Sequence, residues 1–317
     1  ISSAASDVYK RQVTLLTPAL KQGLPPSPQA QHGDANAHRL RSSRQVGTAI
    51  MRQADGCGFS SEIFVAMSSA SPWQDWHGTG LVVGCGGIGQ ALLQELGRIA
   101  PGLQLLGASR QDWRLPGDPL WREVGFLPLD LTDDSSLSAL AASLENRPPL
   151  RLVINTAGLL HGPLLQPEKR LSQVNRQALE RSFAVNAFAP LLLAQAIESL
   201  FSPADPFHFA SLSARVGSIG DNQLGGWYAY RAAKAAQNQM LRTLALEWAR
   251  RKPKGCVSLL HPGTTATGLS APFQAGLPRD RLFSPERAAQ QLLDVLGVLG
   301  PQQTGQFWAW DGQQIPW

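Results

Sequence analysis

The sequence predicts an α/β fold in which a parallel, doubly wound sheet is flanked by helices within a single domain. Two observations predict this fold. Short apolar runs alternate with amphipathic, helix-length segments from residue 79 onward, and a glycine-rich turn, GCGGIG at 84–89, joins the first run to the first such segment. Repeated strand–helix units need crossover connections, which make neighbouring strands parallel.

Strands are expected at the apolar runs bounded by Gly, Pro, Asp or Ser. These runs cover residues 79–84, 103–109, 125–131, 150–158, 206–213, 255–263 and 305–312. Helices are expected where apolar residues recur every three to four positions. These segments are 89–100, 134–144, 176–200, 225–250 and 284–299. Ser284 and Pro285 supply an N-cap and a first-turn proline for the last helix.

Residues 1–66 do not continue this pattern. They are rich in Pro, Gln, Ser and Gly without apolar periodicity, and the first dozen residues resemble translated adapter sequence from assembled metagenomic reads. We therefore expect residues 1–66 to be a disordered or non-native extension. Met67 is then the native start, and the domain covers 67–317.

Charge and cysteine content argue against several classes of protein. Residues 1–66 carry 7 Lys and Arg against 4 Asp and Glu, whereas residues 67–317 carry 21 against 19. A nearly neutral body argues against a nucleic-acid or membrane partner. The three cysteines are widely spaced, and His161, His208 and His261 lack ligand spacing, so no metal is expected. Without a signal peptide or an apolar run of about 20 residues, a cytoplasmic protein is expected.

The turn at 84–89 fits the pattern G-x-G-x-x-G between a strand and a helix, which is the context of a dinucleotide-binding turn. Gly84 would permit the tight turn, Gly86 the approach of a pyrophosphate, and Gly89 close packing of helix on strand. The free N–H groups of the helix start would bind the phosphates. A turn with purely structural glycines is the alternative.

The end of the second strand indicates which dinucleotide binds. An acidic residue here would bind the ribose 2′-hydroxyl of NAD, but the sequence has Ser109 and Arg110. A hydroxyl and a guanidinium suit the 2′-phosphate of NADP. NADP is therefore expected over NAD, and Asp112 is the residue most able to reverse this preference.

The segment GGWYAYRAAKAAQ at 225–237 carries two tyrosines and a lysine. In a helix Tyr230 and Lys234 share one face, whereas Tyr228 is rotated roughly 120° away from Lys234. A lysine beside a phenol favours the phenolate, which would tune Tyr230 as a proton donor and acceptor. The alternative is a pair of surface residues on an ordinary helix.

Together these motifs resemble those of the short-chain dehydrogenase/reductase family over residues 79–317, and in particular its bacterial C-factor-like branch. The resemblance implies that Tyr230, Lys234 and Asn186 are catalytic and that Asp130 contacts adenine. The cofactor-binding residues expected here are Gly84, Gly86, Gly87, Ile88, Gly89, Ser109, Arg110, Asp130, Leu131, Asn155, Ala157, Gly158, Tyr230, Lys234, Pro262, Gly263 and Thr264.

Two departures from the family pattern stand out. The glycine turn is one residue shorter than most members have. The family serine follows the fifth strand, but Ala214 occupies its position here. Ser213 is the catalytic serine we expect and Ser218 is the alternative. A one-residue shift reverses side-chain direction, so Ser213 can serve only where the strand has ended or bulged.

The resemblance implies hydride transfer between a nicotinamide and a carbonyl or alcohol carbon. Tyr230 would protonate the oxygen, Lys234 would lower the tyrosine pKa and hold the nicotinamide ribose, and Asn186 would support Lys234. We expect an NADP(H)-dependent oxidoreductase that acts on a small carbonyl or alcohol and forms a homodimer or homotetramer. The alternative is a catalytically silent dinucleotide-binding sensor or scaffold, which the displaced serine motivates.

Overall fold

The computed structural model describes residues 72–317, except 115–117, 164 and 276–277. The interpretation of residues 1–66 as an extension, and of Met67 as the native start, lies outside the described residues.

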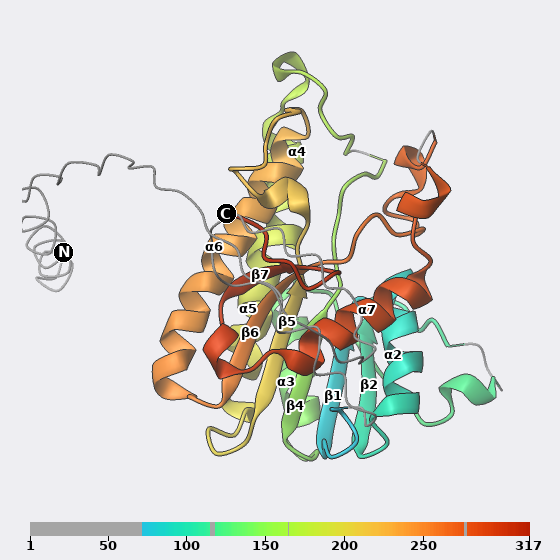
Figure 1. The fold of residues 1–317 in the computed structure, drawn as a ribbon, viewed down its shortest axis with the longest axis vertical. Helices are drawn as coiled ribbons and strands as arrows, with labels where there is room; N and C mark the ends of the chain where they lie inside the picture. Colours follow the sequence, from blue (N-terminus) through green and yellow to red (C-terminus); the bar gives the residue numbers. More distant parts are fainter. Residues whose placement is uncertain (1–71, 115–117, 164, 276–277) are drawn as a thin grey trace, which may run out of the picture. The chain divides into compact units, whose positions relative to one another are not determined.

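Seven strands form one parallel sheet in the order β3-β2-β1-β4-β5-β6-β7 (Figure 1). Their bounds are Gly78–Val83 for β1, Leu103–Ser109 for β2, Gly125–Pro128 for β3, Leu150–Asn155 for β4, Phe207–Leu212 for β5, Gly255–His261 for β6 and Gln306–Ala309 for β7. The chain runs outward from β1 to β3 and then returns to β4 on the other side of β1. This order confirms the predicted doubly wound fold.

Helices cover both faces of the sheet (Figure 1). On one face α2 (Gly87–Ile99) packs against α7 (Pro285–Val298), and their leucines meet the side chains of β1 and β2. On the other face lie α3 (Asp134–Leu144), α5 (Ala189–Ile197) and α6 (Tyr228–Arg251). Each face therefore buries its own apolar cluster, as strands covered on both sides require.

The predicted helix over 176–200 is interrupted. It consists of α4 (Arg176–Phe183), a π-helical turn (Ala184–Phe188), α5 and a final 3₁₀ turn (Glu198–Leu200). Short π-helical turns are rare and often occur at functional sites. The apolar period predicts the helix but carries no signal for this interruption.

Residues 176–200 are also the one described helical segment that is long and apolar enough, by length and composition alone, to cross a membrane. Its apolar residues Ala189, Leu193 and Ile197 belong to the core cluster on the α3–α5–α6 face. These three side chains pack on the sheet, and the segment as a whole is partly buried.

The segment before β1 packs against the sheet and α7 near the start of the strands. Trp73 is 2% exposed and donates from Nε1 to the Leu293 carbonyl oxygen at 3.3 Å. The Trp76 ring stacks on the His208 ring of β5, with 5.3 Å between centroids. Burial lowers the pKa of His208 to about 4. This histidine is therefore neutral in the folded protein at neutral pH.

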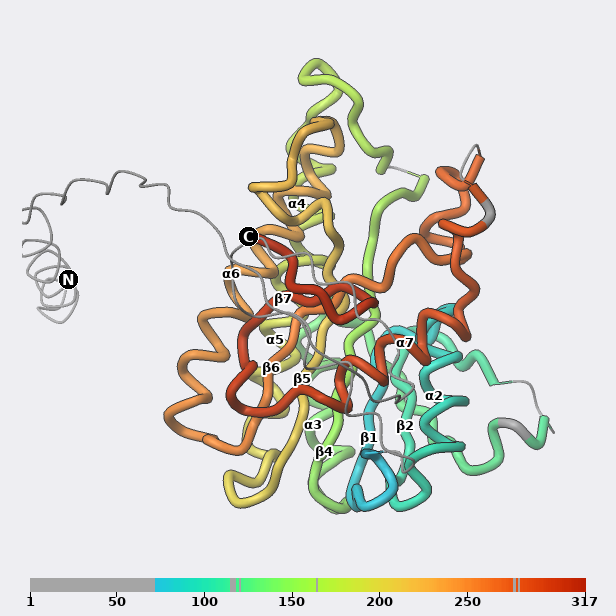
Figure 2. Tube along the Cα trace, in the orientation of Figure 1, coloured from blue at the N-terminus to red at the C-terminus, as the bar shows by residue number. Residues whose placement is uncertain are grey.

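Loops leave the opposite, carboxyl ends of the strands. Figure 2 shows the long segments after β4 and β6 extending beyond this end of the sheet. Parallel sheets bind ligands at this end, where the chain direction reverses between β1 and β4. The residues singled out in the sequence lie at this end.

We predict that the burial of His208 makes the domain less stable in mild acid. The unfolded histidine takes up a proton near its ordinary pKa of 6.5, whereas the folded one does so only near 4. Between these values the unfolded state binds more protons, so His208 lowers the free energy of unfolding by about 1.4 kcal/mol per pH unit as pH falls. Urea denaturation from pH 7 to pH 4.5 measures this slope.

The matched variant is His208→Leu, which has no group that titrates. Its free energy of unfolding should fall less steeply with decreasing pH than that of the wild type. Parallel pH profiles for the two proteins would show that His208 does not carry the effect.

Candidate active site

In the glycine turn after β1, the backbone at Gly84, Gly86 and Gly89 leaves the space that the sequence predicts for each residue. Gly84 has φ +85°, and a Cβ on it would lie 2.7 Å from the Ala157 nitrogen. A Cβ on Gly89 would lie 2.3 Å from the Gly84 carbonyl oxygen, whereas one on Gly86 would meet nothing within 4 Å. The turn is therefore packed tightly on its inner side and open at Gly86. Gly86 is the N-cap of α2 and no side chain caps it, so this helix start keeps N–H groups for an anion.

At the end of β2, the Ser109 hydroxyl donates to the Gln111 carbonyl oxygen at 2.6 Å, and Arg110 is exposed. Asp112 is engaged by Arg114, with 2.8 Å between Oδ2 and a guanidinium nitrogen. The Arg114 contact also lowers the pKa of Asp112. The acid able to reverse the expected cofactor preference is thus already paired, while Arg110 remains at the surface.

The turn after β4 joins the glycine turn to the centre of the site. The Asn155 side chain is fully buried, and its Oδ1 accepts from the Ala157 N–H at 3.2 Å. A Cβ on Gly158 would lie 3.5 Å from the Asn186 Oδ1 and 4.0 Å from the Lys234 Nζ. The structure therefore brings together three predicted site residues, Gly158, Asn186 and Lys234.

Asn186 lies in the π-helical turn between α4 and α5. Its Oδ1 accepts from the Leu159 N–H at 2.9 Å, and its Nδ2 donates to the Leu159 carbonyl oxygen at 2.7 Å. This paired contact fixes the loop after β4 to the helix. Asn186 therefore shapes the loop directly, and its side chain lies beside Gly158 rather than in a hydrogen bond with Lys234.

Tyr230 and Lys234 stand one turn apart on α6, as the sequence predicts. The Lys234 Nζ lies 5.8 Å from the centroid of the Tyr230 ring, and the two side chains are 2% and 8% exposed respectively. Tyr228 is 41% exposed. The helix geometry thus selects Tyr230 as the partner of Lys234.

Burial sets the pKa values of both residues. It raises the pKa of Tyr230 above its usual range and lowers that of Lys234 to about 7. The expected lowering of the tyrosine pKa by the lysine is therefore not seen in this structure. Burial outweighs any effect of the lysine on Tyr230. The Lys234 Nζ donates instead to the Leu212 carbonyl oxygen and the Gln237 Oε1, both at 2.9 Å.

Both candidate serines are engaged by the scaffold. Ser213 continues the strand register beyond β5, because its N–H donates to the Leu260 carbonyl oxygen at 2.8 Å. Its hydroxyl is buried and donates to the Asn238 Oδ1 at 2.6 Å. The Ser218 hydroxyl is also buried and accepts from the Asp221 N–H at 3.2 Å. The geometry does not favour either serine as a donor to substrate, whereas Ala214 is half-buried.

Three aromatic rings follow one another beside Tyr230. The Trp227 ring lies 6.3 Å from the Tyr230 ring and 5.0 Å from the Phe273 ring, which in turn lies 6.0 Å from the His161 ring. The rings come from the loops after β4 and β6 and from the residue before α6. They form a continuous row, which we call the aromatic row (His161, Phe273, Trp227). Of Trp227, Trp308, Trp310 and Trp317, Trp227 is the one whose ring lies beside Tyr230. The others pack elsewhere, since Trp308 is buried in the core, Trp310 lies on Phe283 and Trp317 on Phe307.

Trp227 adopts an unfavourable backbone conformation. Its φ is +52°, the one positive value among the described non-glycine residues. Its N–H donates to the Glu168 carbonyl oxygen at 2.5 Å, and the buried Glu168 Oε2 accepts from the Ala229 N–H at 3.3 Å. Glu168 thus caps the start of α6 from a distant loop. The residue before α6, Trp227, makes no side-chain capping hydrogen bond of its own.

The loop after β6 reaches the glycine turn. Gly263 has φ +74°, and the Thr264 carbonyl oxygen accepts from the Phe283 N–H at 2.8 Å. A Cβ on Gly87 would lie 3.1 Å from the Thr267 side chain. This places Pro262, Gly263 and Thr264 at the same end of the sheet as the glycine turn.

The predicted adenine-side residues follow the end of β3. The Asp130 carboxylate accepts from the Thr132 hydroxyl and N–H, and these hydrogen bonds lower the pKa of Asp130. Leu131 beside it is buried.

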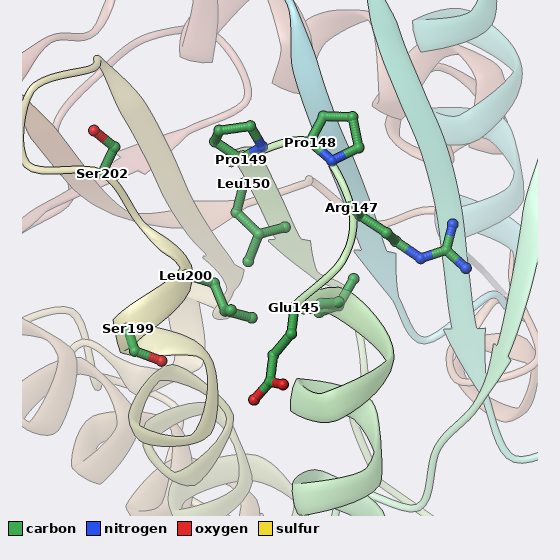
Figure 3. A pocket seen from close by; sticks show the side chains of 9 residues that line it. Glu145, Arg147, Pro148, Pro149, Leu150, Ser199, Leu200 and Ser202 are labelled. Atoms are coloured by element: carbon green, nitrogen blue, oxygen red, sulfur yellow. The ribbon is translucent and has the colours of Figure 1, made fainter.

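A shallow cavity of about 280 Å³ lies at the other end of the sheet. Figure 3 shows its residues coming from the end of α3, the start of β4 and the 3₁₀ turn after α5. None of the expected site residues lines it.

Over the described ranges, no group of three or more His, Cys, Asp or Glu side chains is arranged to hold a metal ion.

The residues at the carboxyl end of the sheet fit a nicotinamide dinucleotide. The open face of Gly86, the uncapped start of α2 and the exposed Arg110 provide an anion-binding edge beside β1 and β2. The buried Tyr230 and Lys234 lie beyond β4 and β5. The order of these groups along the sheet suits a ligand with phosphates at one end and a reactive ring at the other.

Comparison with known proteins supports this interpretation. A family model described as short chain dehydrogenase matches residues 79–277. The 1-hydroxy-2-glutathionyl-2-methyl-3-butene dehydrogenase of Rhodococcus sp. (strain AD45) is 31% identical over 190 residues, which are 60% of this chain and 78% of that protein. C-signal of Myxococcus xanthus is 32% identical over 148 residues, 46% of this chain and 83% of that protein.

Solved structures share the fold. The NADPH-bound carbonyl reductase from chicken fatty liver has a TM-score of 0.65 at 23% identity and covers 76% of this chain and 100% of its own. A short-chain dehydrogenase/reductase of Burkholderia multivorans with bound NADP has a TM-score of 0.62 at 25% identity, with the same coverage.

We predict that Ser213→Ala changes turnover by no more than about threefold, because the lost hydroxyl faces Asn238. Ala214→Ser should instead raise turnover, since it places a donor at the half-buried position that the family serine occupies. Steady-state kinetics of the two variants against the wild type checks both expectations. A loss of about 100-fold in Ser213→Ala would restore Ser213 as the catalytic serine.

Proposed function

This chain belongs to the short-chain dehydrogenase family, and on that premise we propose that it is an NADP(H)-dependent oxidoreductase interconverting a carbonyl and an alcohol. The observation that carries the proposal is the placement of Tyr230 and Lys234. Both are buried on one face of α6, and Lys234 lies beside Gly158 in the turn that follows β4. A buried phenol and a buried amine at the carboxyl end of a parallel sheet are suited to proton transfer.

We propose NADP(H) over NAD(H) because of the residues at the end of β2. Arg110 is exposed there and Asp112 is held by Arg114. An exposed guanidinium can bind a phosphate with charge-assisted hydrogen bonds, whereas the Asp112 carboxylate is already engaged by Arg114. The NADPH and NADP bound to the carbonyl reductase and the Burkholderia enzyme support the same choice.

In the proposed mechanism the protein handles the proton. The bound nicotinamide cofactor supplies the hydride in carbonyl reduction. Tyr230 donates its phenolic proton to the carbonyl oxygen, and its raised pKa keeps the phenol protonated at neutral pH. Lys234 has a pKa of about 7, so it can return a proton to Tyr230 in the same pH range. Ala214 offers no hydroxyl, so the substrate oxygen depends on Tyr230 for its hydrogen bond.

The aromatic row points to an apolar or aromatic substrate body. It offers three aromatic rings in succession, and the Trp227 ring meets the Tyr230 ring edge to face. Holding Trp227 at φ +52° costs about 1–3 kcal/mol, a strain that clusters at functional sites. We propose that this conformation places the indole against the substrate.

A catalytically silent dinucleotide-binding sensor is the second candidate. The observation that favours it is the absence of a free serine hydroxyl at Ser213 and Ser218. The two candidates differ in one measurement, the oxidation of NADPH in the presence of aromatic and aliphatic aldehydes and ketones. Tight NADPH binding with no turnover across the panel would favour the sensor.

We predict that Arg110→Ala weakens NADPH binding about 10- to 150-fold and leaves NADH binding nearly unchanged. Removing a charge-assisted contact to the 2′-phosphate costs roughly 1.5–3 kcal/mol, and NADH lacks this phosphate. Calorimetric titration with both cofactors measures the change. Equal weakening of NADPH and NADH would mean that Arg110 does not bind the 2′-phosphate.

Tyr230→Phe should reduce turnover by about 10²–10⁴-fold while NADPH still binds, since only the proton donor is lost. Tyr228→Phe is the matched control, because the same hydroxyl is removed two residues away on an exposed face. Its turnover should stay close to that of the wild type. An active Tyr230→Phe enzyme would contradict the proposed proton transfer.

A further inference from the structure

Gln237 is a buried amide on the same face of α6 as Lys234. Its side chain is fully buried, and both of its ends are hydrogen-bonded. Oε1 accepts from the Lys234 Nζ at 2.9 Å, and Nε2 donates to the Ser211 hydroxyl at 2.8 Å. A buried polar side chain costs free energy unless it is paired, so this amide is held in one orientation.

The hydrogen bonds continue from Gln237 to the turn after β4. The Ser211 hydroxyl also accepts from the Asn155 Nδ2 at 2.9 Å, and Asn155 and Ser211 are register partners on β4 and β5. The Asn155 Oδ1 then accepts from the Ala157 N–H at 3.2 Å. Lys234, Gln237, Ser211 and Asn155 thus form an unbroken buried chain, which we call the amide relay.

The position of the Lys234 ammonium depends on this relay. Its Nζ donates to two acceptors, the Leu212 carbonyl oxygen at the end of β5 and the Gln237 Oε1 on α6. On the loop after β4, a Cβ on Gly158 would lie 4.0 Å from this Nζ and 3.5 Å from the Asn186 Oδ1, and both are uncharged residues. The Tyr230 ring, which carries a titratable hydroxyl, lies 5.8 Å from the Nζ. Gln237 therefore supplies one of the two acceptors of a buried amine.

We propose that Gln237 is a positioning residue, which rests on the proposed function: it holds the protonated Lys234 at the end of β5 and ties it to the nucleotide-binding turn at Asn155–Gly158. A hydrogen-bond acceptor stabilises the ammonium over the neutral amine. Because the Lys234 pKa is about 7, its protonation near neutral pH responds to the loss of a single acceptor.

The test is the titration of Lys234 itself, followed by NMR of protein labelled with ¹³C at the lysine ε-carbon. The chain has six lysines, and Lys234→Met identifies the signal. In Gln237→Met, which keeps the volume but removes the acceptor, the Lys234 pKa should fall by about one to two, corresponding to roughly 10- to 100-fold weaker proton binding. An unchanged Lys234 pKa in a folded Gln237→Met protein would overturn the proposal.

Gln237→Glu tests the same contact with the opposite sign. A carboxylate keeps the acceptor and adds negative charge, so the Lys234 pKa should rise above that of the wild type. This variant decides the question if Gln237→Met does not fold. A Lys234 pKa in Gln237→Glu that does not rise would contradict the proposed contact.

Ser211→Ala and Ser258→Ala form a matched pair on neighbouring strands, both fully buried. Ser211→Ala removes one of the two acceptors of the Gln237 Nε2, which also donates to the Leu212 carbonyl oxygen at 3.3 Å. It should lower the Lys234 pKa by less than Gln237→Met does, whereas Ser258→Ala should leave it unchanged. Equal effects of the two serine variants would indicate a general loss of packing and overturn the relay. These titrations need no cofactor or turnover, so an inactive wild type would remove the proposed function without deciding the role of Gln237.

Discussion

Lys234 donates to the Leu212 carbonyl oxygen at the carboxyl end of β5, and this buried contact fixes α6 against the sheet at the point where the site forms. A Cβ on Gly217 would lie 2.8 Å from the Lys234 Cβ, so the loop after β5 packs directly on the same helix turn. Tyr230 lies one turn earlier on α6, and its position follows from the same contact. The start of this helix is capped by Glu168 and lies at Trp227, so the loops after β4 and β5 both contact α6 near Tyr230 and Lys234.

Burial has opposite consequences for the two titrating groups. It keeps Tyr230 protonated and makes Lys234 easy to deprotonate, which together suit a proton donor that is refilled from a neighbouring amine. The amide relay opposes part of the effect on Lys234, because its acceptor stabilises the ammonium. We therefore expect the protonation of Lys234 to depend on its burial and on its two acceptors together.

Much of the fold could be predicted from the sequence, because apolar periodicity and turn residues are local signals. The strand over 103–109 and the helix over 134–144 have the predicted bounds. The pairing of Tyr230 with Lys234 follows from helix geometry alone. The π-helical turn at Asn186 and the backbone of Trp227 depend on tertiary contacts and have no local signal. Gln237 could have been noticed as an amide three residues after Lys234 on the same helix face, but its partner Ser211 is distant in sequence. The direction in which the Tyr230 pKa shifts could not be predicted from the sequence. A nearby lysine charge would lower this pKa and burial raises it, and only the structure shows how deeply Tyr230 is buried.

The most direct test of this account is a crystal structure of the protein with NADP⁺. The account predicts the 2′-phosphate beside Arg110, the pyrophosphate at Gly86 and the start of α2, and the nicotinamide ribose next to Tyr230 and Lys234, with the Lys234–Gln237 contact retained. A dinucleotide bound elsewhere, or a bound 2′-phosphate that does not contact Arg110, would contradict it.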